Sequence, residues 1–401
     1  MVAPIDVLYV FTARKRRLLA GVEAGTEPDT LLFGLNQLRA DPNHGVAAWE
    51  APSPVAVDFH EPVFGRIGRA AMSAVGRLGP DAVQLRTLGQ FAGRDVAFLT
   101  GGWPLLFASR LIPAARRPRI VWLNMTLTNL LRRGGPRASV LAAAARLADR
   151  IVCVSSDQQA FLARRLGLPV TRLPVVLNGT DARFYAPELA GASAGAVGVR
   201  EGASAGGRDA RGPEEGRERR SGEPALVLAA GRDAARDYRT LAEALAGTGH
   251  HAVVVCSPAN LEGVTLPPGV DVRLDVPPAT LRDLYARATV VVVPTRGDGD
   301  PVGSDCSGTL VTLDALAMGR PVVVTARASV PEYVTPGAHV TTVPPGDVTA
   351  LRAAINRAMS GDHAVAKMVA DEARAGQAHV RSTRTTDNFA AGIANVFREV
   401  A

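Results

Sequence analysis

The chain has 401 residues, of which 47% are hydrophobic and 21% charged, and this length is sufficient for two hydrophobic cores rather than one. It contains no run of about 18 consecutive apolar residues, and its basic cluster RKRR at 14–17 follows the first apolar segment instead of preceding it. These features argue against a transmembrane helix and a secretion signal. We therefore expect a two-domain cytoplasmic protein with at most peripheral membrane contact.

The formal net charge of +7 comes almost wholly from arginine, because Lys15 and Lys367 are the only lysines. Together with abundant Ala and Gly, this arginine excess is typical of GC-rich coding and predicts a solvated basic surface. Only 5% of the residues are aromatic, which leaves few rings on which nucleic-acid bases could stack. We therefore expect no nucleic-acid partner.

Short apolar segments alternate with helical patterns through the first half of the chain. The expected strands are IDVLYVF (5–11), DVAFLT (95–100), RIVWLN (119–124) and IVCVSS (151–156). The expected helices cover PDTLLFGLNQLRA (28–40) and SVLAAAARLA (139–148). Strands that are apolar on both faces and separated by helices indicate a parallel sheet covered on both sides.

Residues 189–224 contain almost no large apolar side chains, and their opposite charges nearly cancel. Such a segment cannot bury enough surface to order itself, so we predict a disordered insertion in an interdomain linker. The insertion sets the expected boundaries: an N-terminal domain at 1–185, the insertion at 186–224, a C-terminal domain at 225–380 and a last helix at 381–401 that packs toward the N-terminal domain.

The second half repeats the alternation of strands and helices. Expected strands are ALVLAAG (225–231), HAVVVCS (251–257), VDVRLDV (270–276), TVVVVPT (289–295), PVVVT (321–325) and HVTTVPP (339–345). Helices are expected at 279–288, within 304–319, after a capping Asp347 and in two further segments before the end. Ligands of such doubly wound sheets bind beyond the carboxyl ends of the strands, so the cleft between the halves is the expected site.

The cysteines are three in number and far apart, at Cys153, Cys256 and Cys306. The first two lie in or at the end of apolar segments. An odd number of separated cysteines in such surroundings favours free, buried thiols over disulfides or metal ligands.

The segment SDCSGTLVTLDALAMG (304–319) joins a predicted strand to a predicted helix that starts at Ser307 and Gly308. A helix N-terminus attracts anions, and glycine there lets a phosphate approach closely. Asp314 lies eight residues after Cys306, two turns further and about 12 Å along the helix axis. A phosphorylated nucleoside could place its phosphates at the helix start and its ribose near Asp314. The alternative is an ordinary capped helix with a solvent-facing Asp314.

Two arginines follow the first strand of the second half. Arg232 and Arg236 come just after ALVLAAG, at the edge of the sheet where fixed cations could meet a diphosphate. Each arginine taken alone is more typical of a surface charge. Together with the helix start, they favour a nucleoside diphosphate as the ligand.

The segments GRDAARDYRTLAEAL, SDCSGTLVTLDALAMGRPVVVTARASVPEYV and VPPGDVTALRAAI occur in an order that resembles the retaining nucleotide-sugar glycosyltransferases of family 4. In the first half, LADRIVCVSSDQQAFLARRLGLP and VVLNGTDARFY resemble the segment that leads into the linker of this family. The resemblance implies an α/β chain with the GT-B fold, in which two Rossmann-like doubly wound domains face each other across a cleft. It also implies sugar transfer from a nucleoside-diphosphate sugar to a hydroxyl of a polar acceptor, with no cofactor and no metal.

The resemblance implies roles for residues of the second half. Asp314 would bind the ribose of the donor, one methylene shorter than the usual glutamate, and Arg232 with Arg236 would contact the diphosphate. The distal phosphate would be held by the backbone of four residues at the helix start: Ser307, Gly308, Thr309 and Leu310.

At two positions the chain departs from the family pattern. Cys306 stands where the family has a glutamate that contacts the donor sugar, and the neighbouring Asp305 could make this contact instead. Asn124 stands where the family has a histidine; its amide could hydrogen-bond a sugar hydroxyl but does not titrate near neutral pH. Gly25 and Gly102 are expected on the acceptor side.

Three further features have alternative interpretations. The loop GDGDPVGSD (297–305) is either solvated or binds a divalent cation or an amino-bearing sugar or acceptor through its aspartates. The RKRR cluster either receives an anionic acceptor or membrane surface, or is solvated. Asn178-Gly179-Thr180 matches a glycosylation sequon, which we interpret as a turn at the start of the linker.

Several functions remain possible from the sequence. The leading hypothesis is a retaining glycosyltransferase acting on a small natural product, with a cell-envelope glycan or glycolipid as the rival acceptor. The second hypothesis is a nucleotide-sugar-binding partner protein without transfer activity, and the third is a relative that cleaves glycosidic bonds with phosphate.

Overall fold

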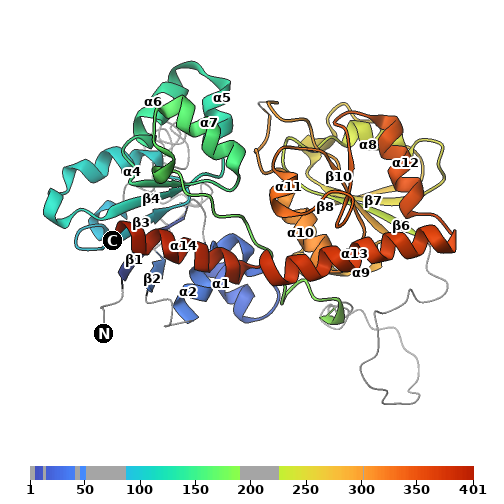
Figure 1. Cartoon of the computed structure of the whole chain (residues 1–401), viewed down its shortest axis with the longest axis horizontal. Helices are drawn as coiled ribbons and strands as arrows, with labels where there is room; N and C mark the ends of the chain where they lie inside the picture. The colour runs from blue at the N-terminus through green and yellow to red at the C-terminus, as the bar shows by residue number, and fades with distance from the viewer. Residues whose placement is uncertain (1–4, 12–14, 41–45, 51–86, 190–224, 301) are drawn as a thin grey trace, which may run out of the picture.

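The computed structural model describes residues 5–11, 15–40, 46–50, 87–189, 225–300 and 302–401. They form two α/β halves side by side, with the last two helices running beneath both (Figure 1). Most of the insertion predicted at 186–224 lies outside the described residues. Among those residues, no helix is long and apolar enough to cross a membrane.

The N-terminal half is built on a five-stranded sheet, as the apolar segments predicted. Its strands are all parallel and lie in the order β2-β1-β3-β4-β5. Their bounds are β1 Ile5–Val10, β2 Val46–Glu50, β3 Val96–Leu99, β4 Arg119–Leu123 and β5 Arg150–Val152. The edge strand β2 was not predicted.

The helices of this half cover both faces of the sheet. They are α1 Arg16–Glu23, α2 Leu35–Ala40, α4 Trp103–Ala108, α5 Leu127–Arg133, α6 Gly135–Ala145 and α7 Ser156–Leu166. The helix predicted at 28–40 is wrong, because the segment divides into a 3-10 turn at Asp29–Leu32 and α2. Phe33 and Gly34 separate them with left-handed φ values of 51° and 83°.

The C-terminal half contains a six-stranded sheet, again entirely parallel, in the order β11-β10-β9-β6-β7-β8. The strands are β6 Leu226–Ala230, β7 His251–Cys256, β8 Val270–Leu274, β9 Val290–Val293, β10 Val322–Thr325 and β11 Thr341–Val343. All were predicted from their apolar segments. Chain order reverses between β6 and β9, which makes their carboxyl ends the expected binding crevice.

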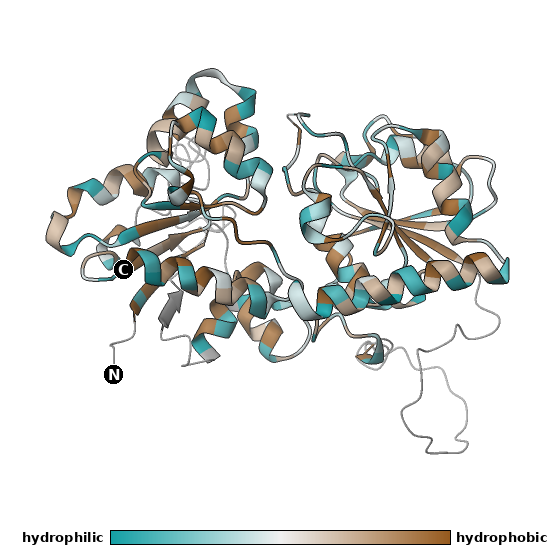
Figure 2. Cartoon of the chain, viewed as in Figure 1, coloured by the Kyte–Doolittle hydropathy of each residue, from teal (hydrophilic) through white to brown (hydrophobic). Residues whose placement is uncertain are grey.

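Six helices pack around this sheet and bury its central strands, which are the most hydrophobic segments in Figure 2. They are α8 Tyr238–Leu245, α9 Pro278–Arg287, α10 Thr309–Ala317, α11 Val330–Tyr333, α12 Val348–Ala358 and α13 His363–Thr383. Helix α13 continues past residue 381, the predicted start of the last helix.

The last helix, α14 (Thr386–Val400), belongs to the core of the N-terminal half. Its Phe397 ring lies 5.5 Å from that of Phe98 and 6.1 Å from that of Tyr9, measured between centroids. The chain therefore crosses between the halves twice, once after β5 and once between α13 and α14 (Figure 1). At these crossings Thr180 and Thr385 pair through their backbones.

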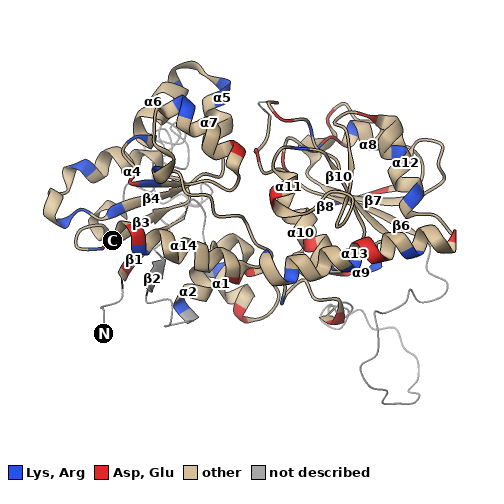
Figure 3. Ribbon diagram, viewed as in Figure 1, with Lys and Arg blue, Asp and Glu red and all other residues tan. Residues whose placement is uncertain are grey.

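All three cysteines are free, as expected, with Cys153 and Cys256 buried and Cys306 partly so. The basic residues are distributed over both halves, with acidic residues among them (Figure 3). This distribution matches the solvated surface expected from the composition.

Candidate functional site

A cavity of about 750 Å³ opens at the carboxyl ends of β6, β7, β9 and β11 in the C-terminal half. It includes the crevice between β6 and β9, and every residue that lines it lies between Arg232 and Gly346. Asn260 shapes one wall, because its amide accepts from the hydroxyl of Ser257 and donates to the carbonyl of Asp233. We call this cavity the donor pocket, after the nucleoside-diphosphate donor that the sequence leads us to expect.

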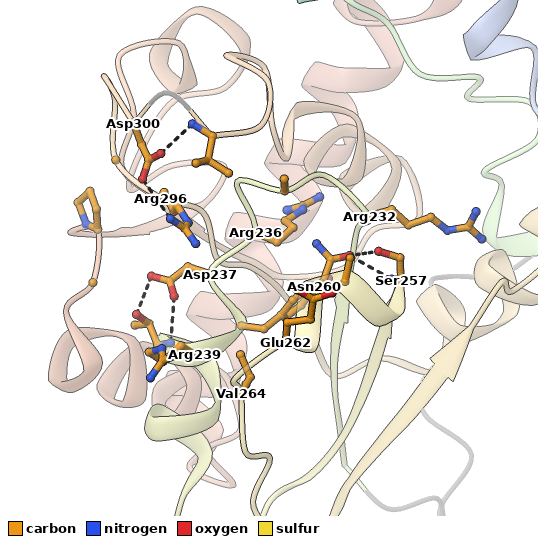
Figure 4. A pocket seen from close by; sticks show the side chains of 18 residues that line it. Arg232, Arg236, Asp237, Arg239, Ser257, Asn260, Glu262, Val264, Arg296 and Asp300 are labelled. Atoms are coloured by element: carbon orange, nitrogen blue, oxygen red, sulfur yellow. Dashed lines mark hydrogen bonds and ion pairs between the residues drawn. The ribbon is translucent and has the colours of Figure 1, made fainter. Parts of the chain in front are cut away.

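Arg236 lies in the middle of the donor pocket (Figure 4). Its exposure is only 5%, yet its Nε and Nη1 atoms have no hydrogen-bond partner among the described residues. Burial lowers the pKa of this guanidinium, which is the direction expected for a cation removed from water. A Cβ on Gly231 would collide with this guanidinium, so glycine is required there. Arg236 is a buried cation whose hydrogen-bonding capacity is free for an anion.

The start of α10 lies against this guanidinium. Gly308 precedes the helix with a φ of 90°, and no side chain caps the helix. A Cβ at Gly308 would lie 3.2 Å from Nη1 of Arg236, and the buried hydroxyl of Ser307 has no partner in the described structure. The N-terminus of α10 therefore lies beside the guanidinium of Arg236, an arrangement that suits an anion. Ser307 and Gly308 themselves line a separate cavity of about 20 Å³.

Arg327, which sequence reasoning missed, is the second cation at this point. It follows β10, its side chain is only 6% exposed, and its Nη1 donates to the carbonyl of Ser307 at 3.4 Å. Its position directly after a parallel strand is the signal that could have identified it, because such residues line the carboxyl edge of the sheet.

The aspartates of the 297–305 loop each pair with a different arginine. Asp298 lies 3.1 Å from Nε of Arg327, and Asp300 lies 3.4 Å from Nη1 of Arg296. Asp305 pairs with Arg132 of the N-terminal half at 3.3 Å. The described residues contain no group of three His, Cys, Asp or Glu side chains suited to a metal ion. The loop is thus partly solvated, with Asp298 42% exposed, and its aspartates are paired with arginines. Binding of a cation or an amino group stays a prediction.

Arg232 lies at the rim of the donor pocket. Its side chain is 54% exposed and pairs with Asp275 at 3.2 Å. It extends away from Arg236 in Figure 4. The structure therefore brings only one of the two predicted arginines to the start of α10.

Asp314, the predicted ribose-binding residue, is not among the residues that line the donor pocket. It is buried, and its Oδ1 accepts a hydrogen bond from the hydroxyl of Thr180 in the linker. Burial, with a smaller contribution from the charge of Asp181, raises the pKa of Asp314 to about 7. The carboxyl therefore joins α10 to the linker, and its contact with a ribose stays a prediction.

Asp305 and Cys306 lie at the interface between the halves. Besides Arg132, Asp305 accepts from the amide of Gln158 at 3.4 Å. Cys306 packs against the core of the N-terminal half, and burial raises the pKa of its thiol. Both residues therefore lie between the two halves, and their contact with a donor sugar stays a prediction. Thr309 and Leu310, predicted phosphate contacts, form the first turn of α10.

The N-terminal candidates lie away from the donor pocket. Asn124 is 0% exposed, and its amide donates to Thr128 Oγ1 at 2.8 Å, so a sugar would have to displace this bond. Gly102 starts α4 with a φ of 79° and lines a small cavity of about 40 Å³. Gly25 occupies a turn after α1. Of the RKRR cluster, residue 14 lies outside the described residues.

Comparisons with known proteins agree with this geometry. Residues 227–361 match the family described as glycosyl transferases group 1. Among curated proteins, no sequence matches the chain.

Similar solved structures extend over nearly the whole chain. Anabaena Alr3699/HepE in complex with UDP and glucose has a TM-score of 0.60 and 15% identity, covering 98% of this chain and 99% of that one. Sucrose-phosphate synthase from Thermosynechococcus elongatus has a TM-score of 0.60 and 16% identity, covering 98% of both chains. Trehalose 6-phosphate synthase from Burkholderia multivorans has a TM-score of 0.66 and 13% identity, covering 100% of this chain and 99% of that one. Residues 227–361 thus match a glycosyl transferases group 1 domain, and the two parallel-sheet halves have the GT-B fold of these solved structures.

Proposed function

We propose that the protein is a retaining, family 4 glycosyltransferase that transfers a sugar from a nucleoside-diphosphate sugar to a hydroxyl of a small polar natural product in the cytoplasm. The observation that carries this proposal is Arg236, a buried guanidinium with two nitrogen atoms that lack a partner among the described residues, beside the start of α10. A diphosphate supplies the charge and the acceptor oxygens that this site lacks. The complexes of Alr3699/HepE with UDP and glucose support the same class of donor.

Transfer with retention would proceed by attack on the face from which the diphosphate departs. The bond between the anomeric carbon and the phosphate oxygen breaks, the acceptor oxygen bonds to the same carbon, and the departing phosphate oxygen takes the proton of the acceptor. Charge then develops on the diphosphate, where Arg236 and the helix dipole stabilise it most strongly in the transition state. This route needs no protein nucleophile, and we propose that it needs neither metal nor cofactor.

A second candidate, a nucleotide-sugar-binding protein without transfer activity, is favoured by one observation. Asp314, Asp305 and Cys306 belong to the segment that resembles the donor-binding segment of family 4, but they are turned toward the linker and the N-terminal half. Both candidates require donor binding at Arg236. Only the transferase releases sugar from the donor.

Replacing Arg236 tests the donor site. Arg236→Gln removes the charge and keeps a polar side chain, so we expect weaker thermal stabilisation by UDP-, GDP-, ADP- or dTDP-glucose than in the wild type. A ligand at 100 times its Kd adds about 2.7 kcal/mol of stability, which makes the shift measurable. For turnover we expect a loss of about a hundredfold, because one preorganised contact to a developing charge contributes about 3 kcal/mol.

Arg119→Gln is the matched control, because Arg119 is an exposed arginine paired with Asp149 outside the donor pocket. Equal donor binding by Arg236→Gln and the wild type would remove Arg236 from the donor site. Release of nucleoside diphosphate and sugar from a bound donor, followed by NMR of the anomeric proton of the product, separates transfer from binding alone and reports the stereochemistry.

A further inference from the structure

Arg327 and Arg236 approach the start of α10 from different strands. Arg236 follows β6, whereas Arg327 follows β10, and β9 lies between these two strands in the sheet. Both reach the same turn, because a Cβ at Gly308 would lie 3.2 Å from Nη1 of Arg236 and Nη1 of Arg327 donates to the carbonyl of Ser307 at 3.4 Å. Burial lowers the pKa of Arg236, and the charge of Arg327 lowers it further. Two buried cations at a helix N-terminus repel each other unless anions compensate them.

Asp298 compensates one of these cations. One carboxylate oxygen accepts from Nε of Arg327 at 3.1 Å, and the other accepts from the backbone N–H of Ala328 at 2.6 Å. A guanidinium and a backbone N–H are also the donors that bind phosphate groups in proteins. The carboxylate of Asp298 therefore occupies two hydrogen-bond donors, Arg327 Nε and the Ala328 N–H, that could bind a phosphate instead.

The two partners differ in their freedom to move. The side chain of Asp298 is 42% exposed, whereas that of Arg327 is 6% exposed and also bonded to the carbonyl of Ser307. Asp298 lies between two glycines, and Gly299 adopts a left-handed φ of 89° with open space around it. The carboxylate can therefore turn into solvent while the guanidinium stays in place.

We propose that Asp298 is an internal counter-anion that holds Arg327 and the Ala328 N–H in the resting enzyme and is displaced by the diphosphate of the donor. Arg327 then becomes a binding residue for the leaving group alongside Arg236. This inference rests on the proposed function, because it assumes that a diphosphate binds at the start of α10. Displacement is required, since a carboxylate left beside a diphosphate would repel it.

A competing internal anion reduces the apparent affinity for an external anion in proportion to the fraction of sites that it leaves free. Asp298→Asn keeps the shape of the side chain and removes the competing charge, so we expect pyrophosphate and UDP to bind at least about fivefold more tightly. Arg327→Gln should weaken both ligands about tenfold, the effect of losing one charge-assisted contact. In the double variant the gain in affinity from Asp298→Asn should disappear, because the guanidinium of Arg327 that it would free is absent.

Isothermal titration with inorganic pyrophosphate and with UDP measures these affinities, and pyrophosphate makes the result independent of base preference. Asp371→Asn is the control for the change in net charge, because Asp371 pairs with Lys367 on the exposed side of α13. Thermal unfolding of each variant verifies that it is folded, and Asp298→Ala repeats the test with a second side chain.

Unchanged or weaker pyrophosphate binding by a folded Asp298→Asn variant would overturn the inference. The same conclusion would follow if Asp371→Asn or the double variant showed the same gain. If Arg236→Gln loses UDP while Asp298→Asn binds it like the wild type, only the counter-anion fails. If the wild type binds neither ligand, the proposed function fails and the inference with it.

Discussion

The carboxyl group of Asp314 is buried, and this environment favours its neutral form. Burial is the main reason that its pKa rises to about 7, and Asp181 adds to the effect. An acid whose pKa is raised by folding stabilises the fold below its unfolded pKa of about 3.9, and this contribution is lost as the pH rises through the folded pKa. The native state should therefore lose stability between about pH 4 and pH 7 through this group.

Asp314→Asn tests that balance. The amide keeps an acceptor for Thr180 and cannot ionise, so we expect the variant to melt several degrees above the wild type at pH 8 and close to it at pH 4. Asp275→Asn, at an exposed carboxyl, should show no such trend. Thermal unfolding measured across this pH range gives the answer, and parallel curves for wild type and Asp314→Asn would contradict the assignment.

Spacing in the sequence could not reveal the direction of this side chain. Eight residues separate Cys306 and Asp314, but α10 begins only at Thr309, and the direction of each side chain depends on what packs against it. Here the partner is Thr180, 134 residues away. The location of Arg236 in the cavity was predictable, because it follows directly from the position of this residue after β6.

At the scale of the element, the start of α10 depends on one glycine. Gly308 has a φ of 90°, and an added Cβ would lie 2.7 Å from Val293 Cγ1 and 3.2 Å from Nη1 of Arg236. Gly93 also has a φ of 90°, but an added Cβ would meet nothing within 4 Å. Comparing substitutions at Gly93 and Gly308 therefore separates the cost of backbone strain from the cost of the clash with Val293 and Arg236.

We expect Gly93→Ala to cost about 1–2 kcal/mol of unfolding free energy, the penalty of a left-handed L-residue. Gly308→Ala should cost more and should also weaken UDP binding, because its methyl group pushes Arg236 away from the helix start. Urea unfolding and titration with UDP measure the two effects. If both variants bind UDP like the wild type, the close approach at Gly308 is not needed for the donor.

The strands of the C-terminal sheet were predictable because each is a short run of residues that are apolar on both faces. The structure of segment 28–40 was not predictable in this way. Its apolar residues have helical spacing, but the backbone at Phe33 and Gly34 interrupts the helix. A Cβ added to Gly34 would lie 3.1 Å from Ala390, so a close approach to α14 accompanies this break. Local pattern carries no information about such distant neighbours.

At the scale of the whole molecule, the halves are joined at the paired crossings and at a set of side-chain contacts. A Cβ on Gly179 would collide with the carbonyl of Thr385, so the crossings approach as closely as glycine allows. This packing explains why the middle residue of Asn178-Gly179-Thr180 is a glycine. Beyond the crossings, Glu332 of α11 accepts from the backbone and hydroxyl of Ser156.

Tyr333 of α11 is a buried contact between the halves, with an exposure of 3%. Its hydroxyl donates to the carbonyl of Val154 at 2.6 Å and accepts from the N–H of Asn178 at 3.1 Å. Tyr333→Phe removes both bonds and leaves buried backbone groups without this partner, which we expect to cost about 2 kcal/mol of unfolding free energy. Tyr9→Phe is the matched control, because the bond that Tyr9 donates, to the carbonyl of Phe33, lies within the N-terminal half.

The amide of Asn178 reports this contact directly. In Tyr333→Phe its hydrogen exchange should become faster than in the wild type, because the N–H loses its acceptor and the halves separate more readily. Small-angle scattering should then show a larger radius of gyration for Tyr333→Phe than for Tyr9→Phe. If exchange at Asn178 is unchanged in Tyr333→Phe, the tyrosine contributes nothing to the arrangement of the halves.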